Sequence, residues 1–222
     1  MMSLARENIA KRKRILLADD HDVVLVGLRQ LLNRADLEIV GSATNGQALV
    51  KAAEELRPDA IITDITMPLL NGIDAARLIR KKDARVKMIF LGEHSEISYA
   101  VEALSLGRSG YVLKSSVINE LPSAVDRVMR GRTYVASAIR KSVMKAFQGR
   151  LRNRADTSDG LTLRQREVLQ MLSEGRRMKE IAGRLSLSEK TVEFHKYRVM
   201  QKLGVHTLAE LARYAVKSGL VA

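Results

Sequence analysis

The sequence predicts an α/β domain built on a five-stranded, parallel, doubly wound sheet, followed by an all-α domain of four helices. Three observations lead to this prediction. Short apolar runs alternate with amphipathic stretches over residues 14–130, whereas residues 161–222 carry only helical patterns. The charge is also uneven, because residues 1–136 have a net charge of +3 and residues 137–222 a net charge of +10.

The elements of the first domain follow from the periodicity of its apolar residues. Stripes such as Leu121, Val125 and Val128 recur every three or four residues and predict helices between the strands. Strands that alternate with helices form a parallel sheet with right-handed crossovers and helices on both faces. The predicted strands are residues 14–19, 38–43, 60–64, 87–91 and 109–113.

The boundaries follow from composition. We expect the first domain over residues 12–133, a partly helical linker over 134–158 and the second domain over 159–222. The linker ends in a charged and polar stretch, residues 150–160, which is typical of a flexible connection.

Capping residues divide the second domain into four short helices. Thr162 with Gln165 forms a capping-box pattern that opens the first helix, and Gly175 follows its end. Ser188 can cap the third helix, and Gly204 ends it. The tight Ser-Leu-Ser turn before the third helix predicts a helix-turn-helix arrangement.

The third helix has two different faces at 3.6 residues per turn. Val192, Val199 and Leu203 share the side that should face the core. A mixed polar and aromatic outer face with basic flanks suits the major groove of DNA, because cations meet phosphates while the outer face meets base edges. The alternative is an ordinary solvated helix, but the +10 charge favours DNA binding.

Charged residues follow the apolar runs of the first domain. Asp19 and Asp20 end one run, Asp64 ends a second, and Lys114 ends a third. The carboxyl ends of parallel strands meet at one edge of an open sheet, where ligands bind. We therefore expect a small polar pocket with three carboxylates and one lysine. The alternative is that the acids cap the helices that follow them.

Bulk composition restricts the class of protein. The chain has no Cys, which excludes disulfides and thiolate metal sites and suits a reducing compartment. No apolar run approaches the roughly 20 residues that a membrane span needs. We therefore expect a cytoplasmic protein without a membrane partner.

Both halves resemble one family, the two-domain response regulators of the LuxR/NarL/FixJ type, over about residues 14–221. These proteins join a flavodoxin-like receiver domain to a LuxR-type helix-turn-helix domain. The receiver motifs are Leu-Ala-Asp-Asp-His at 17–21, Asp-Ile-Thr-Met-Pro at 64–68, Asn-Gly-Ile-Asp at 71–74 and Gly-Tyr-Val-Leu-Lys at 110–114. The DNA-binding motifs are Leu-Thr-Leu-Arg-Gln-Arg-Glu-Val-Leu at 161–169, Lys-Glu-Ile-Ala at 179–182, Lys-Thr-Val-Glu-Phe-His at 190–195 and Lys-Leu-Gly-Val at 202–205.

The resemblance implies a phosphorylation site. Asp64 would be the phosphoacceptor of a partner histidine kinase, since a carboxylate can attack a phosphoryl group. Asp19, Asp20 and Asp64, with a backbone carbonyl at Thr66, would bind Mg²⁺, which prefers hard oxygen ligands and neutralises charge on the phosphoryl group. Lys114 would hold a phosphoryl oxygen.

Gly92 departs from the family pattern. A Thr or Ser normally ends the fourth strand, and its hydroxyl binds the phosphoryl group; Tyr111, the aromatic residue that usually follows the resulting movement, is present. We predict that Asp64 is still phosphorylated but that the active state is favoured less strongly. A change in dimerisation or DNA affinity of about 100-fold or more on phosphorylation, worth about 2.7 kcal/mol, would contradict this prediction. Ser95 is nearby in sequence, and its role stays open.

The resemblance also assigns roles in the second domain. Relatives often have Lys at the position of Glu193, and an acid there would alter the preferred DNA site. The last helix, with Leu208, Leu211 and Ala215, resembles the dimer helix of the family. The alternative role for it is to close the small core, and the two roles are compatible. The expected DNA-contacting residues are Lys179, Lys190, Thr191, Glu193, Phe194, Lys196, Tyr197 and Lys202.

The sequence therefore predicts a homodimeric, DNA-binding transcription regulator that is not an enzyme. A regulator of the same architecture that works without phosphorylation is the alternative that Gly92 favours. A Mg²⁺-dependent phosphohydrolase is disfavoured, because Thr66 stands where such an enzyme needs a second acid. His21, His94 and His195 are scattered along the chain, so surface or packing roles are expected rather than a metal site.

Overall fold

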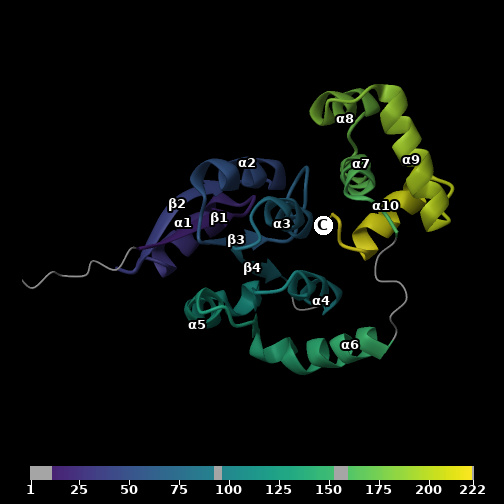
Figure 1. Ribbon diagram of the computed structural model, residues 1–222. Coiled ribbons are helices and arrows are strands. Elements are labelled where there is room, and N and C mark those ends of the chain that lie inside the picture. The colour runs from purple at the N-terminus through teal and green to yellow at the C-terminus, as the bar shows by residue number, and fades with distance from the viewer. Residues whose placement is uncertain (1–11, 93–96, 153–159, 222) are drawn as a thin grey trace, which may run out of the picture.

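A computed structural model describes residues 12–92, 97–152 and 160–221 of the chain and shows the predicted fold class, an α/β domain followed by four helices (Figure 1). Ser95 and His94 lie outside the described residues.

The α/β domain contains a parallel sheet in the order β2-β1-β3-β4-β5-β6. Five of the strands are the predicted ones. The sixth, β6, is a two-residue strand beside β5 at the edge of the sheet, where Tyr134 pairs with Gly110. It is too short to produce a periodic pattern in the sequence. The strands are β1 (Lys13–Ala18), β2 (Leu37–Ala43), β3 (Ala60–Asp64), β4 (Lys87–Gly92), β5 (Ser109–Leu113) and β6 (Tyr134–Val135).

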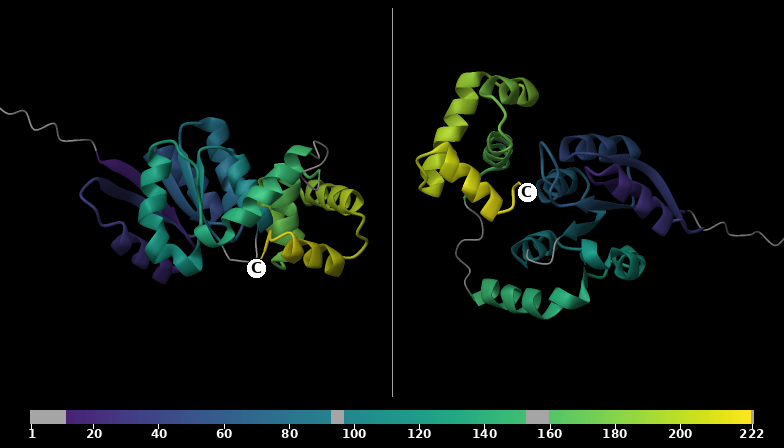
Figure 2. Two further views of the ribbon diagram at one scale, coloured as in Figure 1. Left: turned by 90° about the horizontal axis from the view of Figure 1, so that it is seen from below. Right: turned by 180° about the vertical axis from the view of Figure 1, so that it is seen from behind.

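Helices cover both faces of this sheet (Figures 1 and 2). One face packs on α1 and α5, and the other packs on α2, α3 and α4. Successive side chains of β1 point to opposite faces of the sheet. Ile15 and Leu17 therefore enter the core on one face, and Leu16 and Ala18 enter the core on the other. These helices are α1 (Asp22–Leu31), α2 (Gly46–Leu56), α3 (Gly72–Lys82), α4 (Ile97–Ser105) and α5 (Val117–Met129), with a 3-10 turn, η1 (Lys114–Ser116), before α5.

The segment between the domains is helical over much of its length. A 3-10 turn, η2 (Ser137–Ile139), leads into α6 (Arg140–Arg152), which packs against α4. Ile139 and Val143 are buried there and extend the receiver core. The helix therefore packs as part of the α/β domain, although its residues fall within the predicted linker.

The second domain consists of α7 (Leu163–Ser173), α8 (Met178–Leu185), α9 (Glu189–Leu203) and α10 (Leu208–Lys217). The Thr162 and Gln165 capping box forms at the start of α7, and the Ser188 side chain accepts a hydrogen bond from the backbone N–H of Thr191 at the start of α9. Gly204 ends α9 with a φ of 65°, in the left-handed region that favours glycine.

The two domains contact each other through α7 and the end of α10. The side-chain amide of Gln170 on α7 binds the loop between β3 and α3, while α9 lies on the side of its domain away from the receiver (Figures 1 and 2). At the other end of the interface, Gly219 lies directly against the phenol of Tyr99 on α4, where even a Cβ would collide.

Candidate functional site

The three acids and the lysine converge at the carboxyl edge of the sheet. Asp64 ends β3, Asp19 and Asp20 follow β1, and Lys114 follows β5. The Lys114 ammonium donates a hydrogen bond of 2.8 Å to Asp64 Oδ2 and lies 3.3 Å from Asp19 Oδ2. The predicted pocket thus forms from residues that are up to 95 positions apart in the chain.

The Asp64 carboxylate is both buried and oriented. Its Oδ1 accepts a hydrogen bond of 2.7 Å from the backbone N–H of Ile65, which leaves Oδ2 to face Lys114. Burial raises the pKa of Asp64 to about 6, although Lys114 lowers it in part. A carboxylate held at this edge and only partly stabilised as an anion is suited to attack an electrophile.

Asp19 and Asp20 differ in exposure. Asp19 is completely buried, and its Oδ2 accepts no hydrogen bond from the part of the chain that the structure describes. Asp20 is exposed at the mouth of the site.

Burial lowers the pKa of Lys114, but its hydrogen bond to Asp64 and the charges of Asp64 and Asp19 outweigh this and raise the pKa. The lysine is therefore a fixed cation among carboxylates.

These acids fit a hard divalent cation. A buried carboxylate oxygen without a hydrogen bond beside two further carboxylates is an incomplete arrangement that a Mg²⁺ ion would complete. Sequence analysis did not anticipate that His21 would join this group. Its Nδ1 lies 2.9 Å from Asp20 Oδ1 and 3.2 Å from Asp19 Oδ1, although its side chain is largely exposed.

Gly72 allows the loop after β3 to fold closely over the site. A Cβ on Gly72 would lie 2.0 Å from the Asp64 carbonyl oxygen, so no other residue fits there. The Gly72 N–H donates to the Ile65 carbonyl, and the Asn71 side chain caps α3 through the N–H of Asp74. Asn71 and Gly72, which belong to the Asn-Gly-Ile-Asp motif at 71–74, thus support the loop that follows Asp64.

The helical domain forms part of the surroundings of this site. A cavity of about 370 Å³ has Asp20 and Thr66 on its receiver side and Gln170, Glu174 and Leu220 on the other. Gln170 Nε2 donates to the Met67 carbonyl at 2.7 Å, and its Oε1 accepts from the Asn71 N–H at 2.9 Å. Gln170 and Glu174 are not among the predicted site residues, because the sequence around a polar residue on a short helix does not indicate its partner.

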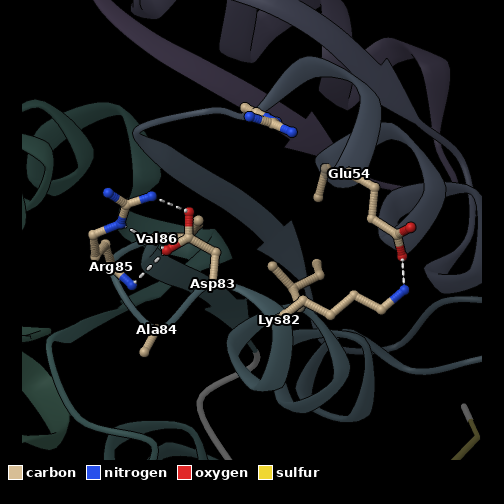
Figure 3. A pocket seen from close by; sticks show the side chains of 9 residues that line it. Glu54, Lys82, Asp83, Ala84, Arg85 and Val86 are labelled. Carbon is tan, nitrogen blue, oxygen red and sulfur yellow. Dashed lines mark hydrogen bonds and ion pairs between the residues drawn. The ribbon is translucent and has the colours of Figure 1, made fainter.

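A second hollow lies at the opposite edge of the sheet and takes no part in the site. It measures about 640 Å³ and lies near the C-terminal ends of α2 and α3 (Figure 3). Its labelled charges pair among themselves, Lys82 with Glu54 and Arg85 with Asp83. Within each of these exposed ion pairs, the positive charge is neutralised by the negative charge of its partner.

The outer face of α9 is exposed as predicted. Val192 and Val199 are completely buried in the domain core, whereas the Phe194 and Tyr197 side chains are 54% and 59% exposed. Arg198 lies 5.4 Å from the Phe194 ring centroid, and Gln201 donates a hydrogen bond to the Tyr197 hydroxyl. Lys190 and Glu193 are exposed beside them. The aromatic and charged surface expected of a reading helix therefore exists and is accessible.

Two predicted DNA contacts, Lys202 and Thr191, have further roles within the domain. Lys202 donates to the Gly160 carbonyl at 2.5 Å and to Gln165 Oε1 at 2.9 Å, so it also holds the start of α7. Thr191 takes part in the cap of α9 through a 2.8 Å hydrogen bond with Ser188. Lys196 is half-buried, while Lys179 is exposed. His195 is a packing residue on α9, and burial lowers its pKa.

Comparison with known proteins assigns both halves. Residues 15–126 match the family described as "Response regulator receiver domain", and residues 159–215 match "Bacterial regulatory proteins, luxR family". The chain is 35% identical to the transcriptional regulatory protein MctR of Rhizobium johnstonii, over 94% of this chain and 95% of MctR. It is 32% identical to the response regulator UvrY of Escherichia coli K12, over 93% of this chain and 94% of UvrY.

A solved structure of two RcsB dimers bound to two parallel DNAs has a similar fold. It matches with a TM-score of 0.57 and 27% identity, over 94% of this chain and 99% of the RcsB chain. Among the described residues, no helix is long and apolar enough to cross a membrane.

Proposed function

Because the chain belongs to the family of two-domain response regulators with a LuxR-type DNA-binding domain, we propose that phosphorylation of Asp64 controls it. It is a DNA-binding transcriptional response regulator of a two-component system. The observation that carries the proposal is the buried Asp64 carboxylate, held 2.8 Å from Lys114 and beside Asp19.

In the proposed reaction, Asp64 Oδ2 attacks the phosphorus atom of a phosphohistidine or a small phosphodonor and forms an acyl phosphate. The bond from phosphorus to the histidine nitrogen, or to the donor oxygen, breaks at the same time, and the free histidine or dephosphorylated donor leaves. The Ile65 N–H fixes the other carboxylate oxygen, and Lys114 is placed to hold a phosphoryl oxygen once the group is transferred. Mg²⁺, bound by Asp19, Asp20, Asp64 and the Thr66 carbonyl, would neutralise charge on the phosphoryl group.

The proposed phosphodonor is a sensor histidine kinase, as the receiver domain implies. The cavity beside Asp20 and Thr66 is only about 370 Å³ and is bounded by the helical domain. A small phosphodonor fits such a space, whereas a kinase domain does not. We therefore expect the two domains to separate before the kinase transfers its phosphoryl group.

The proposed DNA interface is the exposed face of α9. Glu193, Phe194 and Tyr197 would meet base edges, with Thr191 at the start of the helix. Lys179, Lys190, Lys196 and Lys202 would contact phosphates. Exposed Leu208 and Val216 on α10 support a homodimer, the state in which the related RcsB binds DNA.

The test of this proposal is intact mass after incubation with Mg²⁺ and acetyl phosphate. Wild type should gain one phosphoryl group, and Asp64→Ala should gain none. Asp36→Ala is the matched control, because Asp36 is an exposed surface acid at the start of β2 that pairs with Arg34. A phosphoryl group on Asp64→Ala, or none on wild type, would contradict the assignment of Asp64.

A further inference from the structure

Gly92 is required for space rather than for backbone conformation. Its φ lies outside the left-handed region. A Cβ on Gly92 would lie 2.0 Å from the Tyr111 hydroxyl oxygen and 2.6 Å from Tyr111 Cζ. Tyr111 is completely buried, so its rigid ring cannot rotate into solvent to make room. Any side chain at position 92 would therefore have to displace Tyr111.

This close approach brings the Tyr111 hydroxyl close to the position at which the family has a Ser or Thr side chain. A Ser or Thr hydroxyl is one bond beyond Cβ, and the Tyr111 hydroxyl oxygen lies 2.0 Å from that Cβ position. The phenol therefore occupies the volume of the missing Ser or Thr side chain. Gly at position 92 and the inward Tyr111 ring therefore depend on each other for space.

The sheet register places this hydroxyl near the phosphoacceptor. Leu91 pairs with Asp64 across β3 and β4, and Gly92 pairs with Leu113 across β4 and β5. Position 92 thus lies at the strand ends between Asp64 and Lys114, which are themselves hydrogen-bonded. A hydroxyl there is close to the place where the phosphoryl group on Asp64 would lie.

We propose that the Tyr111 hydroxyl replaces the missing hydroxyl at position 92 and donates a hydrogen bond to the phosphoryl group on Asp64. This inference rests on the proposed phosphorylation of Asp64. It assigns Tyr111 a direct binding role, and Tyr111 holds this inward position before phosphorylation.

The experiment uses beryllofluoride with Mg²⁺ as a stable mimic of the phosphoryl group, with its affinity measured by calorimetry on the full chain. Tyr111→Phe removes only the hydroxyl and should weaken beryllofluoride binding about tenfold, the typical effect of one hydrogen bond to a charged group. Tyr134→Phe is the matched control, since Tyr134 donates its hydrogen bond to Glu120 and has no place in the site. Its beryllofluoride affinity should equal that of wild type.

A second pair of variants returns the hydroxyl to its usual position. Tyr111→Val removes the ring and the hydroxyl, and adding Gly92→Ser fills part of the space with a new hydroxyl. Beryllofluoride affinity should fall in the single variant and recover in the double variant. Thermal unfolding of each variant checks that it folds.

The outcomes separate this inference from the proposed function. If wild type and Tyr111→Phe bind beryllofluoride equally, the role of Tyr111 is refuted while Asp64 remains the acceptor. If wild type binds none, both proposals are wrong. If Tyr111→Phe weakens binding and the double variant recovers it, the hydroxyl exchange is established.

Discussion

Replacing Gln170 with Ala should release the helical domain from the receiver. Its amide makes two hydrogen bonds to the loop between β3 and α3, one with the Met67 carbonyl and one with the Asn71 N–H. Each is worth about 1 kcal/mol net, so the closed arrangement should lose about 2 kcal/mol. This corresponds to a shift of about 30-fold toward the open arrangement. In the closed arrangement of this variant, the buried backbone groups of Met67 and Asn71 would also lack hydrogen-bond partners. This destabilises the closed arrangement further and increases the shift.

The absence of Cys from the chain makes this shift directly measurable. Spin labels on Glu55→Cys in α2 and Arg184→Cys in α8, both exposed positions, report the distance between the domains. Gln170→Ala should broaden and lengthen that distance distribution. Gln30→Ala, the same change on the exposed side of α1, should leave it unaltered. An unchanged distribution in Gln170→Ala would refute the idea that this side chain holds the domains together.

Three further predictions concern the two sites. Since burial raises the pKa of Asp64 to about 6, the folded site binds a proton below that pH, and this proton must leave before Mg²⁺ binds. Mg²⁺ affinity measured by calorimetry should therefore fall about fivefold between pH 6 and pH 5, and Asp64→Asn should lack this step. Lys190→Ala and Lys196→Ala should each weaken DNA binding and reduce the salt slope by about 1; an unchanged slope removes that lysine from the interface. Lys202→Ala should additionally destabilise the helical domain by about 1 kcal/mol in thermal unfolding, because it loses its hydrogen bonds to Gly160 and Gln165, whereas Lys217→Ala should not.

The parts of this structure that follow from local patterns were predictable from sequence. The strands β1 to β5 appear as short apolar runs, and β1, β3 and β5 lead into the charged residues of the candidate site. The caps at Thr162, Ser188 and Gly204 mark helix ends through their own side chains or backbone. The spacing of Val24, Leu28 and Leu31 predicts an apolar stripe on the helix after β1, and the structure shows this stripe slightly displaced along α1. Leu25, Leu28 and Leu32 are its buried residues, while Val24 and Leu31 lie at the border of the core. A wide apolar face leaves the exact centre of such a stripe undetermined.

The features that sequence did not predict depend on contacts between distant segments. Nothing local to Gln170 indicates that it binds the backbone at Met67 and Asn71, about 100 positions earlier. Likewise, Gly92 is visible in the sequence as a missing hydroxyl. Only the packing of β4 against β5 reveals that Tyr111 fills its place. A local rule can flag such a departure, but its compensation comes from another strand.

The inward position of Tyr111 and the Gln170 contacts together suggest how the signal travels. If Tyr111 is already inward before phosphorylation, its movement cannot carry the signal, because a ligand shifts an equilibrium only through contacts that differ between the states. The loop that begins at Asp64 remains as the carrier, since Asp64, the proposed acceptor, and the backbone groups bound by Gln170 belong to one continuous segment. Phosphorylation would then act on the domain contact directly. In that case beryllofluoride should lengthen the spin-label distance in wild type and have little further effect in Gln170→Ala. An equal lengthening in both proteins would show that the signal leaves the receiver by another route.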